Sequence, residues 1–245
     1  MNFKSYRSRI YGQYVMAREQ ALAPNTLEGL VPRAPMLRQL VRRYFPEDKD
    51  ANVLDLGCGH GAVIYFAREA GYRNVRGVDG SPEQVAAAAR LGIKEVVQGD
   101  LHDVLREQPA ASVEVVIAFD VIEHFTRDEL VPFVDEVYRV LSPGGRWIMH
   151  VPNGESPFCG RMRYWDMTHE LAFTRTSLGQ LLLSSGFSSV HCFEDTPIVH
   201  GVKSAARWVL WKCFRSMLRL YIAVETGDTS RSQVFSQNML AVATR

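Results

Sequence analysis

The sequence predicts an α/β protein with a doubly wound, seven-stranded, mostly parallel sheet. Short apolar runs alternate with helical patterns along the chain, and Gly, Pro or Asp separates them. Strands that alternate with helices imply crossover connections, which place helices on both faces of a parallel sheet. The 245 residues, 47% of them hydrophobic, suffice for the core of one domain of ordinary size.

Each predicted strand is bounded by a recognisable signal. The first ends at a run of glycines, the second and third end near an Asp, and the fifth follows the helix stop and turn "LSPGG". We expect strands at residues 52–56, 75–79, 95–98, 113–119, 146–152, 190–194 and 234–244. We expect helices at 61–70, 82–91, 127–140 and 176–185, with others before the first strand and after Gly201.

Charge and cysteine usage exclude several classes of protein. A net charge of +1 gives no basic field that would attract nucleic acid, so no nucleic-acid partner is expected. The four cysteines include no CxxC pair, which argues against a zinc site or a disulfide framework and favours reduced thiols in the cytoplasm. The first twenty residues are charged and aromatic, so we expect neither a signal peptide nor a spanning helix there.

The stretch "VLDLGCGHG" places three glycines at alternate positions directly after the first strand. In doubly wound sheets ligands bind at the carboxyl ends of the strands, and glycine lets backbone amides approach a ligand closely. The spacing is GxGxG and not the GxGxxG of dinucleotide-binding proteins. Asp55 precedes the glycines, where it would repel a pyrophosphate, so the loop favours a cationic ligand.

Acidic residues follow the later strands too. In "GVDGSPEQV" Asp79 ends the second strand, about 20 residues after the glycines, where a carboxylate can accept both ribose hydroxyls. In "VVQGDLHD" Asp100 offers an acceptor for an adenine amino group, and Leu101 offers an apolar edge. The fourth strand ends in "VIAFDVIEHF", which crowds together Phe119, Asp120, Glu123 and His124. The pattern predicts a nucleoside cofactor.

Taken in order, "DLGCGHG", "GVDGSP", "GDL", "FDVIEH" and "LSPGG" resemble the class I S-adenosylmethionine-dependent methyltransferases over Val53 to Asn153. The resemblance implies a Rossmann-like sheet with an antiparallel last strand and S-adenosyl-L-methionine as cofactor. It assigns the methionine portion to Asp55, Gly57 and Gly59, the ribose to Asp79 and Gly80, the adenine to Asp100 and Leu101, and the region near the sulfonium to Phe119 and Asp120. Cys58, between the first two glycines, is also expected to bind the cofactor. The alternative is a doubly wound domain whose acids are incidental.

The same resemblance suggests how a single methyltransferase domain, residues 1–245, is organised. An N-terminal helical cap (1–50) would precede the cofactor-binding core (51–153), a substrate lid (154–175) and a C-terminal part (176–245). The lid is rich in polar and aromatic side chains, including Arg161, Arg163, Tyr164 and Trp165, which suits a hydroxylated substrate. Tyr164 and Trp165 could equally pack the lid onto the sheet.

The lid sequence "DMTHELAFT" resembles bacterial methyltransferases of polysaccharide and lipid-linked sugar assembly. This resemblance implies O-methylation of a sugar hydroxyl, a weak nucleophile that needs positioning and one base. We expect His169 to be that base, with Asp166 orienting it and His124 the competing candidate. The chemistry does not require a metal and the sequence shows no tight ligand cluster, so no metal site is predicted, although magnesium-dependent relatives leave the question open.

Other functions remain open at this point. A quinone or small phenolic acceptor is the nearest rival, because the same cofactor core serves those enzymes. A non-catalytic cofactor-binding scaffold of a glycan assembly complex is a second alternative, and the presence of His124, His169 and Asp166 argues against it. The GxGxG spacing and Asp55 argue against a nicotinamide-dependent oxidoreductase.

The segment at about 201–222 predicts a basic amphipathic helix. Its basic half carries Lys203, Arg207, Lys212, Arg215 and Arg219, and its apolar half carries Val202, Ala206, Val209, Leu210, Cys213, Met217 and Leu220. The recurring charges exclude a spanning helix. We expect it to touch the inner membrane surface or a lipid-linked acceptor, which makes the protein cytoplasmic and peripheral. Alternatively its apolar half packs on the sheet or on a second subunit.

Overall fold

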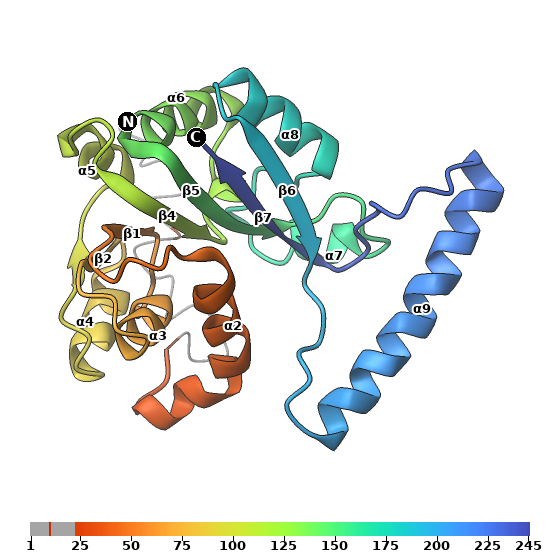
Figure 1. Ribbon diagram of the computed structural model, residues 1–245, viewed down its shortest axis with the longest axis horizontal. Helices are drawn as coiled ribbons and strands as arrows, with labels where there is room; N and C mark the ends of the chain where they lie inside the picture. The colour runs from red at the N-terminus through yellow and green to blue at the C-terminus, as the bar shows by residue number, and fades with distance from the viewer. Residues whose placement is uncertain (1–9, 11–22) are drawn as a thin grey trace.

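The sheet has the predicted doubly wound, mostly parallel architecture. The computed structural model describes residue 10 and residues 23–245. The strands lie in the order β3-β2-β1-β4-β5-β7-β6, and all neighbours are parallel except β7, which is antiparallel to β5 and β6 (Figure 1). Their bounds are β1 (Val53–Leu56), β2 (Val75–Asp79), β3 (Val96–Gln98), β4 (Val113–Phe119), β5 (Leu141–Pro152), β6 (Ser189–Glu194) and β7 (Asn238–Thr244).

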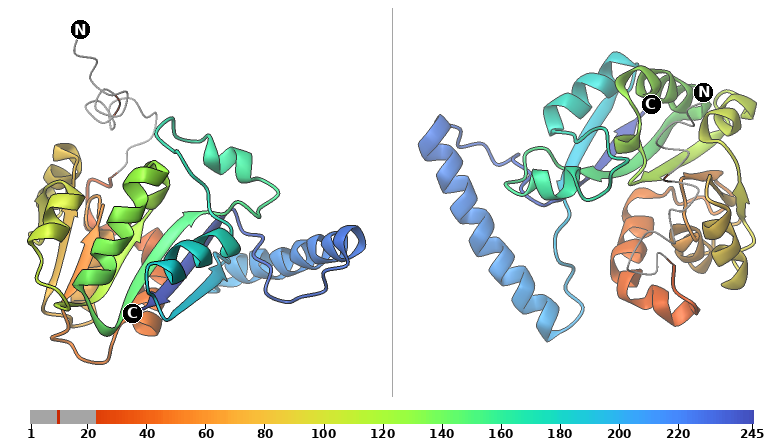
Figure 2. Two further views of the ribbon diagram at one scale, coloured as in Figure 1. Left: turned by 90° about the horizontal axis from the view of Figure 1, so that it is seen from above. Right: turned by 180° about the vertical axis from the view of Figure 1, so that it is seen from behind.

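Helices cover both faces of this sheet (Figure 2). One face packs against η1 (Leu27–Arg33), α2 (Ala34–Tyr44), α3 (Ala62–Glu69) and α4 (Pro82–Arg90). The other packs against α5 (Leu101–Glu107), α6 (Arg127–Val140) and α8 (Arg175–Ser184). Within the expected N-terminal cap, residues 27–44 are helical, whereas residues 1–9 and 11–22 lie outside the described residues.

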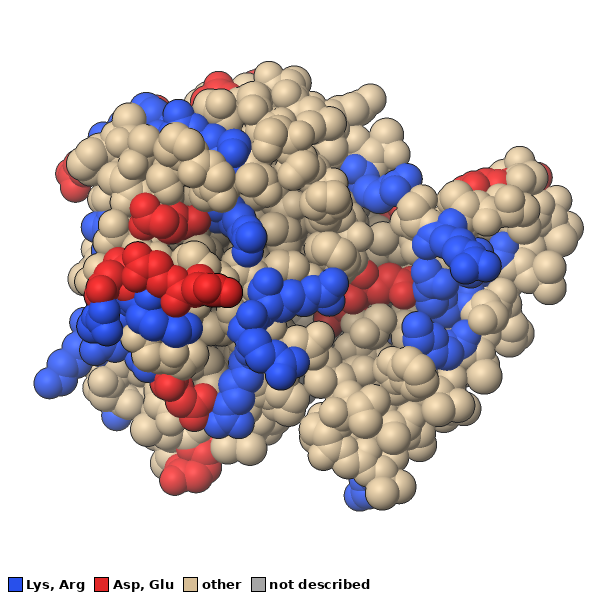
Figure 3. Space-filling model, in the orientation of Figure 1, with Lys and Arg blue, Asp and Glu red and all other residues tan. Residues whose placement is uncertain are grey.

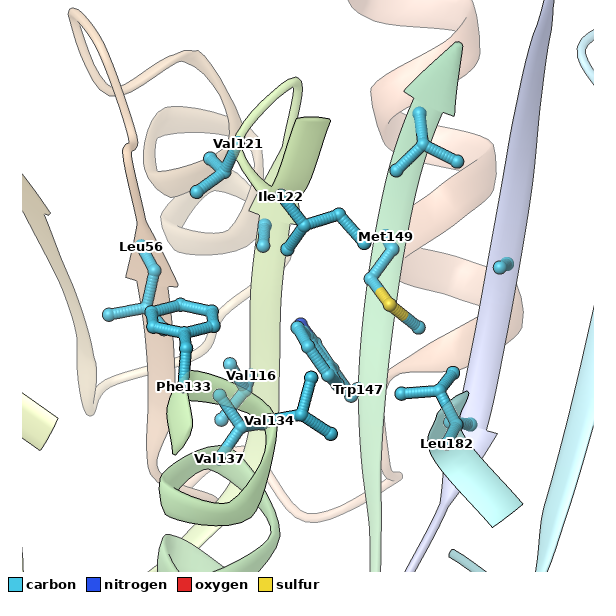
Figure 4. Packing of buried hydrophobic residues seen from close by; sticks show 14 of the residues in the cluster. Leu56, Val116, Val121, Ile122, Phe133, Val134, Val137, Trp147, Met149 and Leu182 are labelled. Carbon is cyan, nitrogen blue, oxygen red and sulfur yellow. The ribbon is translucent and has the colours of Figure 1, made fainter. Parts of the chain in front are cut away.

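Large buried side chains fix α6 and α8 on the sheet. Trp147 of β5 is fully buried, with its ring centroid 6.1 Å from that of Phe133 on α6 and 5.9 Å from that of Phe187 (Figure 4). Leu182 of α8 belongs to the same cluster. Burial of such side chains stabilises the fold by about 1.5–3 kcal/mol each. The same cluster includes side chains of β1 and β4, so it also fixes these two strands.

The structure differs from the prediction at several elements. Helix α5 was not predicted, although Asp100 is a standard N-cap whose Oδ1 accepts from the His102 amide at 2.9 Å. β5 already pairs at Leu141, and the next residues bulge out before Arg146 resumes the ladder opposite Val115. β7 begins only at Asn238, because its ladder with β5 ends there, opposite Pro152.

The segment before β7 is a loop held by a side chain. Asn153 is fully buried, and its side-chain nitrogen Nδ2 donates to the carbonyl oxygens of Val234 at 2.7 Å and Ser236 at 2.8 Å. These bonds satisfy backbone groups that a longer strand would have paired in the ladder. The burial of Val234, Phe235 and Ser236 therefore reflects this loop and not strand pairing.

Helix α9 (Val202–Thr226) projects from the domain as an arm (Figures 1 and 2). Arg215 anchors it through an ion pair with Glu194 at 2.7 Å. The apolar half turns away from the sheet, since Val202 is 88% exposed, Met217 65% and Val224 80%. It does not pack on the sheet. Among the described residues, no helix is long and apolar enough to cross a membrane.

Candidate active site

A cavity of about 820 Å³ opens at the carboxyl ends of the first four strands. The structure brings all the predicted cofactor-binding residues to its wall: Asp55, Gly57, Cys58, Gly59, Asp79, Gly80, Asp100, Leu101, Phe119 and Asp120. His124 lines it as well. The sequence analysis missed other lining residues, including Arg33, His60, Gln84, Val121 and Phe125. Arg33 comes from the end of η1, a contact between distant segments that no local motif signals.

The glycine loop adopts a backbone that requires glycine. Gly57 has φ +67°, and a Cβ there would lie 2.5 Å from Cγ2 of Val121. The amides of Gly57 and Cys58 donate to the Val78 carbonyl at 2.8 and 3.1 Å. The Gly59 amide donates to Oδ2 of Asp79 at 2.8 Å. The loop after β1 is thereby tied to the end of β2.

Asp55 is a buried acid in the wall of the cavity. Its side chain lies on β1, is 2% exposed, and its Oδ2 has no hydrogen-bond partner among the residues the structure describes. Burial and the nearby Asp79 carboxylate raise the pKa of Asp55 well above its usual value. A cationic ligand in the cavity would relieve this unfavourable ionised state.

Asp79 and Asp100 are each oriented by backbone amides. Besides the bond from Gly59, Asp79 accepts at Oδ1 from the Ser81 amide at 2.8 Å. Each carboxylate oxygen has two lone pairs, so these bonds fix Asp79 and leave acceptor capacity for two hydroxyls. Asp100 uses Oδ1 to cap α5, which aligns its carboxylate at the cavity wall.

Asp120 is held by His150. It has φ +56°, uncommon for a non-glycine residue, and its Oδ1 lies 2.8 Å from Nδ1 of His150. Burial opposes the charged form of His150, yet Asp120 and Asp195 together raise the pKa of its imidazole to about 10. His150 is therefore an imidazolium at neutral pH, and its charge keeps Asp120 ionised beside the cavity.

The lid folds back over the end of β4. Residues 154–175 include α7 (Cys159–Arg163) and return to β5 through a bridge between Asn153 and Phe173. The amides of Glu170 and Leu171 donate to the Glu123 carbonyl at 2.7 and 3.0 Å. These two bonds fasten the far end of the lid to the rim of the cavity.

The lid thereby brings His169 against His124, with ring centroids 4.7 Å apart. Arg163 donates to the carbonyl oxygens of His169 and Glu170, so it clamps the lid from within. Burial and His169 lower the pKa of His124 to about 4, which makes its imidazole neutral at physiological pH. Tyr164 and Trp165 are 79% and 60% exposed and do not pack on the sheet.

Asp166 connects to His124 through Thr168. The Thr168 hydroxyl donates to Oδ1 of Asp166 at 2.7 Å and lies 2.9 Å from Nδ1 of His124. The Thr168 hydroxyl has one proton, which it donates to Asp166. Toward His124 the hydroxyl oxygen can therefore only accept, so Nδ1 of His124 must carry a proton and donate it to that oxygen. His169 places its own Nδ1 2.9 Å from the Met162 carbonyl. Asp166 thus orients His124, whereas the sequence analysis expected it to orient His169.

Glu123 is the functional candidate that sequence reasoning passed over. Its side chain is completely buried, with 0% exposure to solvent. Both of its carboxylate oxygens lack a hydrogen bond within the described part of the chain. Burial and the Asp120 charge raise the pKa of Glu123 well above its usual value. The signal was present in "DVIEH", but nothing in the sequence says that this Glu points inward.

The strand order and the acids at successive strand ends are those of the class I S-adenosylmethionine-dependent methyltransferase fold. Residues 54–149 match the family model of the methyltransferase domain. The chain also has the fold of a SAM-dependent methyltransferase from Archaeoglobus fulgidus, with 20% identity and a TM-score of 0.63 over 89% of this chain and 100% of that one.

Curated relatives match over part of their length. Over 152 residues, 61% of this chain, the identity is 34% to a protein of Mycolicibacterium smegmatis named "Probable S-adenosylmethionine-dependent methyltransferase". Over 116 residues, 45% of this chain, it is 37% to trans-aconitate 2-methyltransferase of Mycobacterium tuberculosis. The matches cover 56% and 41% of these two proteins, so the chain spans about half of the relatives it resembles.

S-adenosylmethionine is the cofactor of this domain. The fold is shared with phosphoethanolamine N-methyltransferase 2 of Haemonchus contortus, solved in complex with S-adenosyl-L-methionine, at 16% identity and a TM-score of 0.60 over 100% of this chain and 60% of that one. The residues present fit this molecule, because the orphaned Oδ2 of Asp55 suits its positive charge and the Gly57 cradle admits no Cβ. Asp79, in the wall of the same cavity, has acceptor capacity left for two ribose hydroxyls.

Replacing Asp79 by Ala should weaken S-adenosylmethionine binding about ten- to a hundredfold, because a charged acceptor worth roughly 1.5–3 kcal/mol is lost. Isothermal calorimetry measures the change. Asp135→Ala, at an exposed site on α6, is the matched control and should bind like the parent. Unchanged affinity in a folded Asp79→Ala protein would refute the assignment.

Asp55→Asn should have two opposite effects. The folded state raises the pKa of Asp55, so at neutral pH the ionised group destabilises the fold, and the neutral amide should raise the melting temperature without cofactor. Cofactor affinity should fall about ten- to a hundredfold, because the counter-charge is gone. Thermal unfolding with and without S-adenosylmethionine tests both effects, and a lower melting temperature with intact affinity would contradict this role.

Proposed function

We propose that the whole protein is a methyltransferase that O-methylates a sugar hydroxyl in a bacterial surface polysaccharide or its lipid-linked precursor. The observation that carries the proposal is the meeting of His124 and His169 at the wall of the cofactor cavity, under a lid with exposed aromatic side chains. An acceptor in this position would reach both the imidazoles and the cofactor.

Methyl transfer to a hydroxyl requires that the protein position the acceptor and promote loss of its proton. When bound, S-adenosylmethionine supplies a methyl group already activated on its sulfonium. The acceptor oxygen forms a bond to the methyl carbon, the sulfur–methyl bond breaks with its electron pair left on sulfur, and the hydroxyl proton leaves through the His124 and His169 region. His169 and His124 are the proposed catalytic residues, and Asp166 positions His124 through Thr168.

The lid supports a sugar as acceptor. Tyr164 and Trp165 offer amphipathic rings that remain 79% and 60% exposed, as expected of side chains that meet a ligand with apolar and hydroxyl faces. A small-molecule O-methyltransferase is the second candidate. The similarity to trans-aconitate 2-methyltransferase favours it, because that relative is named for a small acceptor.

Helix α9 supports an acceptor at the inner, cytoplasmic face of a membrane. At about 100° per residue, Lys203 and Lys212 lie on opposite margins of the exposed apolar face, where their chains can reach lipid headgroups. Figure 3 shows further basic side chains over the middle of α9, on the side toward the domain. The cationic margins complement anionic lipid, whereas they would repel a second copy of the helix.

Methyl transfer tests the proposed reaction. Incubation with methyl-labelled cofactor and fractionated cell extract should place label in the polysaccharide or lipid-linked sugar fraction. His169→Ala should keep cofactor affinity and lose about 10²- to 10⁴-fold in turnover, the usual contribution of a group that promotes proton removal. His191→Ala, on the exposed side of β6, is the matched control. Label confined to small molecules would overturn the sugar acceptor.

Vesicle binding tests α9. The protein should co-sediment with anionic vesicles at low salt and less so at high salt, because the attraction to headgroups is screened. Leu220→Glu, which puts a charge on the exposed apolar face, should weaken binding strongly while leaving cofactor affinity unchanged. Absence of binding to anionic vesicles at low salt would rule this contact out.

A further inference from the structure

Three metal-ligating side chains meet beside the cofactor cavity. One ligand atom each from Glu123, His124 and His169 lies within 4.8 Å of the others. Metal–ligand bonds of 2.0–2.2 Å bring such atoms to about 3 Å from one another, a change that small side-chain rotations provide. The sequence separates His169 from the other two, and the lid brings them together.

Glu123 indicates that this cluster is built for a ligand. The side chain is 0% exposed, and neither carboxylate oxygen has a hydrogen bond from any described residue. A buried polar group without a partner is costly, and native proteins retain few of them. A cation between the carboxylate and the two imidazoles would give the Glu123 carboxylate the partner that it lacks.

Both imidazoles are already oriented as metal ligands are. His169 points Nδ1 at the Met162 carbonyl, 2.9 Å away, and His124 points Nδ1 at the Thr168 hydroxyl, also 2.9 Å away. A carbonyl accepts only, and the Thr168 proton is used on Asp166, so each Nδ1 carries the proton and each Nε2 is the coordinating nitrogen. Such outer hydrogen bonds fix the tautomer of metal-bound histidines.

We propose that Glu123, His124 and His169 bind one divalent transition-metal ion, which holds the acceptor hydroxyl toward the cofactor cavity. Two imidazoles and one carboxylate suit Mn²⁺, Fe²⁺, Co²⁺ or Zn²⁺ better than Mg²⁺, which prefers oxygen ligands. Three protein ligands leave coordination positions for an acceptor oxygen. The ion lowers the pKa of that hydroxyl as it does for bound water.

The role of the ion in catalysis rests on the proposed methyl transfer, but its binding does not. In that role His124 and His169 activate the acceptor through the ion, and the hydroxyl proton passes to solvent. Asp120 stays outside the metal site, because His150 engages its carboxylate at 2.8 Å. Asp166 and Thr168 are positioning residues of His124.

Metal binding can be measured on the full chain without any acceptor. After treatment with a chelator and its removal, Mn²⁺, Co²⁺ and Zn²⁺ are titrated separately by calorimetry, and Co²⁺ also by its visible absorption. We expect one ion per chain. Glu123→Gln and His169→Gln should each weaken binding by more than about a hundredfold, and Thr168→Val by about 10- to 100-fold, the usual effect of losing an outer partner.

His191→Gln is the matched control and should bind metal like the parent. S-adenosylmethionine affinity, which depends on the other end of the cavity, should persist in every variant and shows that each is folded. Equal metal binding by the parent and Glu123→Gln, or no binding by the parent, would overturn the site. Metal binding without methyl transfer would instead refute the proposed function, and transfer that survives metal removal would refute the catalytic role of the ion.

Discussion

Burial of carboxylates without hydrogen-bonded partners is the constraint around which the site is built. Asp55 and Glu123 lie at the ends of neighbouring strands, and each has at least one orphaned oxygen within the described residues. A rigid sheet can hold such groups because its strands are fixed from both faces by packed helices. The fold thereby holds an orphaned carboxyl oxygen at two separate points, on Asp55 in the wall of the cavity and on Glu123 beside His124 and His169.

Main-chain hydrogen bonds fix the lid relative to the end of β4. Bonds from Glu170 and Leu171 to the Glu123 carbonyl set the distance between the end of β4 and the lid. Arg163 holds the same stretch from the opposite side. Because the donors of these two bonds are backbone amides, the side chains at Glu170 and Leu171 can vary without loss of the bonds.

The meeting of the predicted cofactor-binding residues in one cavity was predictable from sequence, because these residues follow strands whose carboxyl ends must lie at one edge of the sheet. Helix α5 was equally predictable from the Asp100 cap and the apolar spacing of Leu101 and Leu105, although the sequence analysis gave no range for it. The pairing of His169 with Glu123 was not predictable, since it depends on bonds across the lid. Periodicity correctly gave α9 two faces, yet it could not say which face the domain would meet.

The position of β7 has a consequence for how the chain folds as it is synthesised. Strands β1 to β5 can pair with one another once residue 152 has emerged, whereas β6 pairs only with β7. β6 therefore leaves the ribosome with no strand to join, and all of α9 follows before β7 arrives. During that interval an unpaired strand edge and the apolar face of α9 are exposed together, which makes this the stage of synthesis most prone to aggregation.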